Sequence, residues 1–389
     1  MYSGQMVFSQ LMACLPWWQF SAIVKQYRGD YKVKHFSCAE HFRVMIFAQL
    51  THRKSLRDVE SAFNAIDKKA YHMGIKSSVA KSTLADANEQ RDWKIYSSFA
   101  QILIAQAKQL YADEKFDIEW NGNIYAIDST TIDLCLSIFP WAHFRKTKAA
   151  IKLHTRINLR GCIPEFIHVS DGKLNDVNVL DYIVPEANAF YLFDRAYTDF
   201  QRLYLFTQVG ASFVSLLKKN ILWKRRYSHR IDKTTGVRSD QTVILIGNDT
   251  AAYYPEPLRR IHYYSEERKK HLVFITNNFE LPASEIAALY KMRWKIELFF
   301  KWIKQNLRIK SFFGHNENAV KVQVWIAICT YLLVAIIKKK LDIQQPMSEI
   351  LQVLSILQFE KRPISELFTA YTSNSPNSES HKQLSLFDL

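Results

Sequence analysis

Three acidic side chains stand at positions where they could share one chemical site. Asp128 ends the apolar run "YAID", Asp194 ends the apolar run "AFYLFD", and Glu297 lies in "YKMRWKIELFFKWIKQNL", residues 290–307. Carboxylates held close together repel unless a proton or a cation separates them, and their oxygens suit Mg²⁺, with Mn²⁺ as a substitute. Two such ions about 3.5–4 Å apart serve phosphodiester chemistry. The alternative for each aspartate is structural, because aspartate often ends a strand by favouring a turn.

The stretch around Glu297 has the pattern of an amphipathic helix. One stripe, at spacings of three or four residues, consists of Tyr290, Arg293, Glu297, Lys301 and Lys304. An apolar stripe, one residue out of phase, consists of Leu289, Met292, Ile296, Phe300, Ile303 and Leu307. We expect the helix to pack by its apolar stripe and to hold its single acid near the boundary. The alternative is a solvated acid that cations one turn away merely neutralise.

Strands and helices alternate around the two aspartates. Three apolar, β-branched runs predict a meander: "NIYAIDSTTIDL", "AIKLHTRINL" and "IPEFIHVSDG". A helical stretch ("LNDVNVLDYIV"), the strand ending at Asp194, a second helix ("TDFQRLYLFTQVG") and another strand ("ASFVSLL") follow. The order β-β-β-α-β-α-β is typical of a ribonuclease-H-like fold, a mixed α/β (α+β) sheet in which the first and fourth strands are neighbours. Asp128 and Asp194 are therefore expected side by side.

The remaining segments divide around this core. Residues 1–115 show helical periodicity and predict an all-helical domain. Although any helical domain needs a polar face, the basic residues of this one indicate that it binds DNA: Arg43, His52, Arg53, Lys54 and Arg57. Residues 116–218 form the first part of the catalytic core, 219–281 a β-rich insertion, and 282–345 the second part with the helix of Glu297. That helix is expected to begin at Leu281-Pro282-Ala283, because proline suits the first helical turn. Residues 346–371 predict a C-terminal helical segment and 372–389 a flexible tail.

Charge and composition narrow the class of protein. The chain has 389 residues, 48% of them apolar, and a formal net charge of +15, which favours a polyanionic partner such as DNA over a neutral one. A generic solubility charge is the alternative. Five scattered cysteines suit a reducing cytoplasm and argue against structural zinc. The N-terminus does not resemble a signal peptide, and the apolar run 322–337 is shorter than the roughly 20 residues of a membrane span, so no membrane is expected.

A basic, aromatic stretch in the insertion predicts a second contact with DNA. It contains Lys218, Lys219, Trp223, Lys224, Arg225, Arg226, Tyr227 and Arg230. Cations track phosphates and aromatic rings stack on bases, although a buried structural tryptophan is an equal alternative for Trp223. Lys152 and His154 either approach DNA near the acids or face solvent. We interpret Asp133 and Asp199 as surface or capping acids.

The three acidic regions resemble the motifs of DDE transposases of the insertion-sequence-four family. The matching segments are "IDSTTIDL", "FDRAYTDF" and "YKMRWKIELFFKWIK". The last is similar to the signature Tyr-x-x-Arg-x-x-x-Glu-x-x-x-x-x-x-Lys at Tyr290, Arg293, Glu297 and Lys304. The resemblance implies that Asp128, Asp194 and Glu297 bind two Mg²⁺ ions, and that Tyr290, Arg293 and Lys304 hold the DNA backbone. Where such enzymes form hairpins, the inserted region stabilises a flipped base, so Trp223 is a candidate wedge.

The resemblance also implies a reaction and partners. We expect a bacterial transposase, cytoplasmic and associated with the nucleoid, which works as a homodimer on terminal inverted repeats and target DNA by cut-and-paste. One alternative is a catalytically inactive remnant or repressor that binds transposon ends without cutting them. Another is a nuclease of the same fold that does not transpose.

The last residues predict a separate interaction. "QLSLFDL" resembles the short peptide with which bacterial proteins dock on the DNA-polymerase sliding clamp, at Gln383, Leu384, Leu386 and Phe387. Exposed apolar side chains at the end of a polar tether tend to bind something. The alternative is that this segment packs back onto its own chain.

Overall fold

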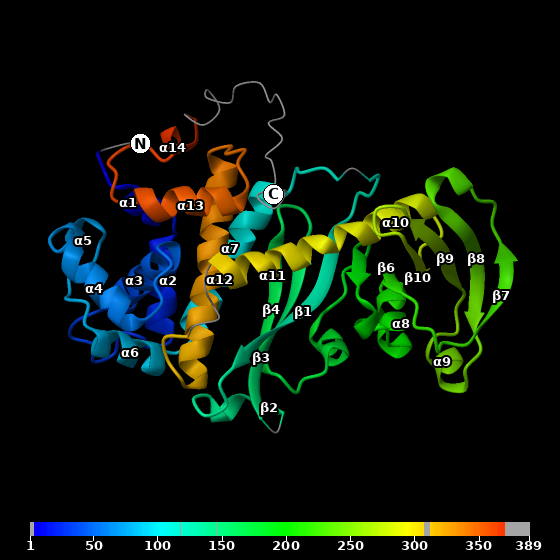
Figure 1. Cartoon of the computed structure of the whole chain (residues 1–389), viewed down its shortest axis with the longest axis horizontal. Helices are drawn as coiled ribbons and strands as arrows, with labels where there is room; N and C mark the ends of the chain where they lie inside the picture. The colour runs from blue at the N-terminus through cyan, green and yellow to red at the C-terminus, as the bar shows by residue number, and fades with distance from the viewer. Residues whose placement is uncertain (1–3, 117, 146, 307–311, 370–389) are drawn as a thin grey trace, which may run out of the picture.

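The computed structural model describes residues 4–116, 118–145, 147–306 and 312–369. The molecule is elongated, with a group of helices at one end and strands β7, β8 and β9 at the other (Figure 1). The N-terminal helices are α1 (Val7–Ala13), α2 (Trp17–Gln26), α3 (Cys38–Leu50), α4 (Leu56–Ile66), α5 (Lys69–His72), α6 (Lys81–Gln90) and α7 (Lys94–Tyr111).

Helix α3 is almost wholly buried among these helices, and its first turn shows why it begins where it does. The Ser37 hydroxyl accepts from the backbone N–H of Glu40, whose carboxylate accepts from the backbone N–H of Ser37 at 2.8 Å. The same carboxylate accepts from the N–H of Lys76 at 2.8 Å. This capping box satisfies donors that a helix start leaves open, and it also fixes the segment before α6.

A single mixed sheet follows the N-terminal helices in the chain. Its strands are β1 (Ile124–Leu134), β2 (His143–Arg145), β3 (Lys148–Asn158), β4 (Ile163–Asp171), β5 (Phe190–Phe193), β6 (Ser212–Leu216), β7 (Trp223–Ser228), β8 (Val237–Leu245), β9 (Leu258–Ser265) and β10 (Lys270–Thr276). The order is β2-β3-β1-β5-β6-β10-β9-β8-β7, with β4 paired to β3. Because β1, β3 and β4 pair in succession and β1 lies parallel to β5, the predicted ribonuclease-H-like arrangement is confirmed.

The stretch predicted as the first core helix differs from the prediction. It forms a short 3₁₀ helix, η2 (Asp176–Tyr182), because its asparagine, aspartate and valine residues disfavour an α-helix. The second core helix, α8 (Phe200–Gln208), forms as predicted, and its N-cap Asp199 accepts from the backbone N–H of Arg202 at 3.0 Å. Shorter elements are η1 (Pro140–Ala142), η3 (Arg195–Tyr197), η4 (Lys233–Thr235) and α9 (Asn248–Tyr253).

The β-rich insertion continues the core sheet. β10 pairs antiparallel with β6, and β9, β8 and β7 follow it in antiparallel order. The predicted boundary between residues 218 and 219 falls in the chain between β6 and β7. The sheet itself is continuous from the core to the insertion, because β10 pairs with β6 and is followed by β9, β8 and β7. The basic stretch contains the outermost strand β7. The division into domains stays a prediction.

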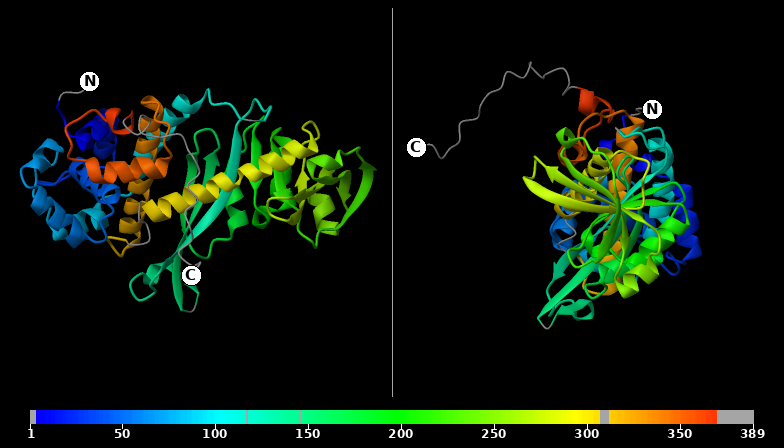
Figure 2. Two further views of the ribbon diagram at one scale, coloured as in Figure 1. Left: turned by 45° about the horizontal axis from the view of Figure 1, so that its top comes forward. Right: turned by 90° about the vertical axis from the view of Figure 1, so that its right-hand side faces the viewer.

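The helix predicted over residues 290–307 is divided at Arg293 into α10 (Ala283–Met292) and α11 (Trp294–Asn306). Two backbone hydrogen bonds of three-residue spacing mark the division: Arg293 N–H to Tyr290 at 3.2 Å and Ile296 N–H to Arg293 at 3.1 Å. The two helices follow each other along the length of the molecule, from the insertion to the helical end (Figure 1; Figure 2, left). Pro282 is the N-cap of α10, close to the predicted start.

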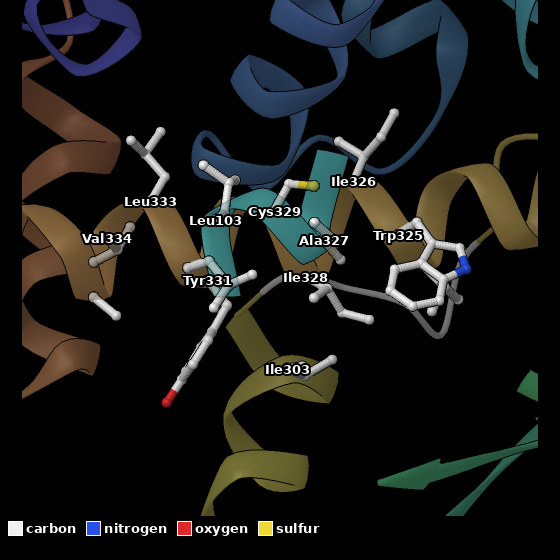
Figure 3. Close-up of a cluster of buried hydrophobic side chains, with 14 of the residues drawn as sticks. Leu103, Ile303, Trp325, Ile326, Ala327, Ile328, Cys329, Tyr331, Leu333 and Val334 are labelled. Carbon is white, nitrogen blue, oxygen red and sulfur yellow. The ribbon is translucent and has the colours of Figure 1, made fainter. Parts of the chain in front are cut away.

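Helix α12 (Glu317–Lys340) passes through the centre of the helical end. It is long and apolar enough to cross a membrane, so our argument from its length was wrong, but 94% of its most apolar window is buried in the protein. Its side chains pack between Leu103 of α7 and Ile303 of α11 (Figure 3). Burial on all sides makes α12 a core helix. Two further helices, α13 (Met347–Leu357) and α14 (Glu366–Thr369), complete the described chain.

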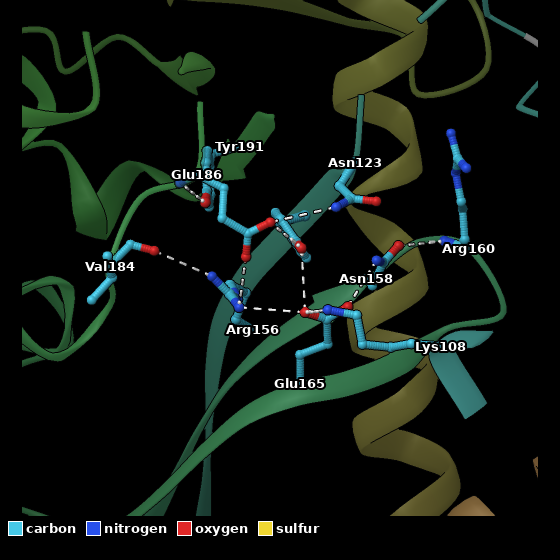
Figure 4. Close-up of polar contacts among 10 residues, drawn as sticks. Lys108, Asn123, Arg156, Asn158, Arg160, Glu165, Val184, Glu186 and Tyr191 are labelled. Carbon is cyan, nitrogen blue, oxygen red and sulfur yellow. Dashed lines mark hydrogen bonds and ion pairs between the residues drawn. The ribbon is translucent and has the colours of Figure 1, made fainter. Parts of the chain in front are cut away.

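A buried carboxylate on β4 connects helix α7 to the sheet (Figure 4). Glu165 is 8% exposed. It accepts from the ammonium of Lys108 at 3.0 Å, from the amide of Asn158 at 2.8 Å and from the hydroxyl of Tyr125 at 3.2 Å. Burial, with this carboxylate nearby, raises the pKa of Tyr125. Because each polar partner is satisfied inside the protein, the network fixes α7 against the core of the sheet.

We expect His41 of α3 to make the protein less stable in mild acid. The side chain is fully buried, its Nε2 donates to the Asn88 carbonyl at 2.9 Å, and its Nδ1 accepts from the Tyr96 hydroxyl at 2.7 Å. Burial holds the pKa of His41 well below its usual value, so the folded protein keeps the neutral ring. Below about pH 6.5 the unfolded chain binds a proton at His41 that the folded chain does not bind. The free energy of unfolding therefore falls by up to about 1.4 kcal/mol per pH unit.

Urea unfolding at a series of pH values measures this effect. His41→Gln is expected to flatten the decline in the free energy of unfolding below about pH 6.5, whatever its effect at neutral pH. His35 is exposed, and His35→Gln is the matched control that leaves the decline unchanged. An unaltered slope in His41→Gln would show that another group is responsible.

Candidate active site

Asp194 lies at the carboxyl end of β5, and Asp128 lies within the adjacent parallel strand β1, where the pairing of β1 with β5 ends. The register of β1 and β5 pairs Ile127 with Phe193, the residues that immediately precede the two acids. Asp194 follows the last residue of β5 and is the N-cap of η3. Both aspartates are partly buried. The two inner strands therefore bring the two acids side by side, as predicted from the strand order.

Glu297 reaches the same place from α11, through Arg293. One Nη of Arg293 donates to Oδ2 of Asp128 at 2.9 Å, and the other donates to Oε1 of Glu297 at 2.5 Å. The guanidinium thus connects β1 with the helix, and its side chain is only 12% exposed. The pairing of Glu297 with the cation four residues earlier, which we considered as an alternative, does form. It is part of a partly buried cluster and does not stand alone on a solvated face.

Three partly buried carboxylates with one arginine among them disfavour the charged form of Asp128. Burial raises the pKa of Asp128 to about 6, and the charges of Asp194 and Glu297 add to this effect. The N–H of Ser129 and the guanidinium of Arg293 oppose it. Burial also lowers the pKa of Arg293, but its acidic neighbours and Tyr290 outweigh this and raise it overall. A site of this kind favours additional positive charge.

The donor set fits a divalent cation that prefers oxygen. Asp128, Asp194 and Glu297 offer only carboxylate oxygens, which suit hard ions such as Mg²⁺ and Mn²⁺. Among the described residues, however, no three acidic, histidine or cysteine side chains converge closely enough to hold a metal ion. Arg293 is the cation that pairs with Asp128 and Glu297 in this structure. The assignment of the three acids as metal ligands stays a prediction.

The other signature residues surround this cluster in different ways. The ring of Tyr290 is buried against Phe274, with centroids 5.0 Å apart, and its hydroxyl has no hydrogen-bond partner in the described chain. Burial raises the pKa of Tyr290 to about 12, so it is a donor at neutral pH. Lys304 donates to the backbone carbonyl of Thr131 at 2.8 Å, on the strand of Asp128. Lys301 is exposed and lines a groove on another side of α11.

Asp176 is an acid that sequence reasoning missed. It accepts from the hydroxyl of Ser129, next to Asp128, at 2.7 Å and from the ammonium of Lys152 at 3.2 Å. His154 is fully buried, lies 3.7 Å from Asp176 and bonds Ser170 at 3.0 Å, so the solvent-facing alternative was wrong for this residue. These contacts give Lys152 and His154 a positioning role around Ser129. The only sequence signal for Asp176 was its place among polar residues shortly after the strand "IPEFIHVSDG".

The basic stretch forms an exposed edge of the sheet. Lys224, Arg225 and Arg226 are exposed along β7, while Trp223 is half-buried and packs under the guanidinium of Arg260, 4.5 Å from the ring. Cations on an edge strand also prevent unwanted pairing with another sheet, which is the structural alternative for this patch. Trp223 packs against the core of the sheet, and its role as a wedge stays a prediction.

An exposed tryptophan beside Arg293 is a second residue that sequence reasoning missed. Trp294 is 48% exposed, and the guanidinium of Arg268 lies 5.9 Å from its ring. Both residues line a hollow of about 320 Å³ that also contacts Tyr290 and Arg293. The signal was present in the sequence, since Trp294 interrupts a run of cations.

Two other groups of predicted residues lie away from the acids. Asp133 is exposed on β1, in agreement with its interpretation as a surface acid. In the helical end, Arg43 packs over Trp17, 3.8 Å from the ring, and Arg53 pairs with Asp58 at 3.8 Å. The predicted clamp-binding residues Gln383, Leu384, Leu386 and Phe387 lie outside the described residues.

Comparison with known proteins places the chain among transposases. Residues 119–333 match the family described as "Transposase DDE domain", and residues 3–76 match a domain of unknown function, DUF4372. A putative transposase y4zB of Sinorhizobium fredii is 31% identical over 73% of this chain and 79% of its own length. A putative transposase for insertion sequence element IS4SA of Synechocystis is 23% identical over 88% and 95%.

Two more similarities complete the comparison. A probable transposase for insertion sequence element IS5377 of Geobacillus stearothermophilus is 30% identical over 53% of this chain and 54% of its own length. A piggyBac transposase synaptic complex with hairpin DNA, seen by electron cryo-microscopy, aligns with 96% of this chain and 81% of its own at 11% identity. Its TM-score of 0.45 is too low to carry an argument.

Proposed function

The chain belongs to the DDE transposase family, as an insertion-sequence transposase of the IS4 type, and we propose that it moves its element by cut-and-paste transposition. Members of this family depend on divalent metal ions. In the proposal, Asp128, Asp194 and Glu297 bind two Mg²⁺ ions, which Mn²⁺ can replace. The DNA partners are the terminal inverted repeats and the target, in the cytoplasm of a bacterial cell.

One observation supports this assignment above the others. Asp128 and Asp194 follow register-paired residues on adjacent parallel strands, and Arg293 connects Asp128 to Glu297 on the helix that crosses them. Three acids from three separate segments thus lie near one another, where the pairing of β1 with β5 ends. Turn preference explains one aspartate at a strand end, but it does not explain three acids at one place.

The proposed reaction has two kinds of step. Water attacks the phosphodiester at the element end and breaks one DNA strand. One side of the break then carries a 3′-hydroxyl and the other side a 5′-phosphate. The 3′-hydroxyl then attacks a second phosphodiester, and the 3′ oxygen of that bond leaves as the new one forms. When bound, the metal ions activate the attacking oxygen and stabilise the leaving oxygen. In the proposed complex, the protein positions the three carboxylates beside the phosphodiester that is cut.

Arg293, Tyr290 and Lys304 have the donors that a DNA backbone requires. Arginine grips a phosphate with two parallel N–H groups, whereas lysine offers a single mobile charge. In the proposed DNA complex, Arg293 exchanges part of its pairing with Asp128 and Glu297 for a phosphate. The buried hydroxyl of Tyr290, which lacks a partner in the described chain, gains an acceptor in the same complex. Lys301, Trp223, Lys224, Arg225 and Arg226 extend the contact with DNA.

Two element ends must be cut together, so we propose a homodimer as the working form. The alternative is a remnant or repressor that binds ends without cutting. Incubation of the protein with a labelled duplex that carries the terminal repeat separates these functions. We expect strand cleavage with Mg²⁺, none with a chelator, and none on a duplex of scrambled sequence. Binding of the terminal repeat without metal-dependent cleavage would support the remnant and contradict the enzyme.

A further inference from the structure

An apolar groove lies between α11, α12 and the start of α13, on a side of α11 other than that of Glu297. Its volume is about 580 Å³, and its floor contains Leu298, Phe299, Trp302, Tyr331 and Met347. Leu298 is 48% exposed, and the ring of Tyr331 meets those of Phe299 and Trp302 edge to face at 5.0 and 4.7 Å. Phe299 and Tyr331 are themselves buried, so Leu298 is the exposed apolar side chain of this groove. A hollow lined mainly by apolar and aromatic side chains is typical of a binding site.

The groove also offers polar features that select an occupant. The indole N–H of Trp302 is buried and has no hydrogen-bond acceptor within the described chain. Lys295 and Lys301 line the groove, and neither has an ion-pair partner among the residues that the structure describes. A matching ligand would place apolar side chains on the floor, a carbonyl oxygen at the Trp302 N–H and negative charge beside the two lysines.

The chain leaves the described structure beside this groove. The amide of Gln345, one residue before the groove-lining Pro346, donates to the backbone carbonyl of Phe368 at 3.1 Å. The description ends at Thr369, and 20 residues follow it in the sequence. Leu384 comes 15 positions after Thr369 in the sequence, and a random-coil chain of that length covers roughly 20 Å.

We propose that the groove binds the C-terminal segment of the same chain. Leu384, Leu386 and Phe387 provide apolar side chains for the floor, and Asp388 and the terminal carboxylate provide negative charge for Lys295 and Lys301. A short flexible tether gives an effective concentration of about millimolar, so even a weak contact is occupied. The docked segment would contact α11, the helix of Glu297, on the side away from the acids. Docking would also cover the residues that we predicted to bind a sliding clamp. The proposed contact is independent of catalysis, so it can be tested in an inactive protein.

Amide hydrogen exchange of the full chain, read by mass spectrometry, tests this proposal. Peptides from residues 380–389 are expected to exchange at least about tenfold more slowly than in the variant Leu384→Ser/Leu386→Ser/Phe387→Ser. Leu298→Asp in the groove should remove this protection. Ile356→Asp, at a 77% exposed position of α13, is the matched control and should keep it. Fast exchange in the wild-type tail, or protection that survives Leu298→Asp, overturns the proposal.

Two measurements distinguish other occupants. Protection that is independent of protein concentration supports docking within one chain, whereas protection that increases with concentration assigns the groove to the tail of a second copy and overturns it. Cys162 lines the groove, and Cys135 is exposed elsewhere. In the triple-serine variant, alkylation of Cys162 should become faster while that of Cys135 is unchanged. An unchanged rate at Cys162 contradicts docking at this place.

Discussion

Asp128→Asn is expected to abolish cleavage of the element end. Asparagine keeps the size of the side chain but removes the charge that, in the proposed site, binds metal together with Asp194 and Glu297. We expect the rate of metal-dependent strand cleavage to fall by at least about a thousandfold, which corresponds to about 4 kcal/mol of activation free energy. Single-turnover cleavage of a labelled terminal-repeat duplex measures the change.

The same substitution should not harm the fold. Burial and the neighbouring acids already disfavour the charged form of Asp128, whose pKa is raised to about 6. Removal of that charge is therefore neutral or stabilising in the protein without metal, and Arg293 keeps its pairing with Glu297. Asp133→Asn, at an exposed position of the same strand, is the matched control and should cleave normally. Equal cleavage by Asp128→Asn and the wild type would remove Asp128 from the catalytic assignment.

The positions of the two aspartates could be predicted because strand pairing is a regular property of the chain. Asp194 follows the last residue of a buried strand, as its apolar run predicted, whereas β1 continues past Asp128 to Leu134. The order of the elements makes the two strands neighbours. Periodicity of 3.6 residues likewise predicted that Ile296, Phe300 and Ile303 of α11 are buried, and they are. Phe299, outside the predicted stripe, is buried as well. Local pattern was sufficient in these cases.

The contacts of Arg293 and Asp176 could not be predicted, because they depend on how separate elements meet. Arg293 lies where α10 ends and α11 begins and donates to two acids, and its place in the helical stripe did not indicate the contact with Asp128. Asp176 meets Ser129 only because the start of η2 lies against the middle of β1. A helical stripe gives the direction of a side chain, but it does not give the partner that the side chain finds in three dimensions.

A buried ion pair in the insertion shows a similar dependence on tertiary structure, and we expect its loss to be strongly destabilising. Arg259 of β9 donates to both carboxylate oxygens of Asp240 on β8, at 2.9 and 2.7 Å, and the two residues are 6% and 4% exposed. Arg259 also donates to the carbonyl of Leu281, just before α10, at 2.6 Å. The pair thus links the insertion to the helix that leads to Arg293 and Glu297.

Asp240→Ala is therefore expected to lower the free energy of unfolding by about 3–5 kcal/mol, because it leaves the guanidinium of Arg259 buried and unpaired. Chemical denaturation measures this loss. The control is the similarly bidentate pair of Arg202 and Asp181, both distances 2.7 Å, in which Asp181 is 54% exposed. Asp181→Ala should cost about 0–1 kcal/mol. The double variant Asp240→Leu/Arg259→Met should recover most of the loss, since it removes both charges. A small effect of Asp240→Ala would mean that water reaches Arg259, and the start of α10 would then be held by the backbone alone.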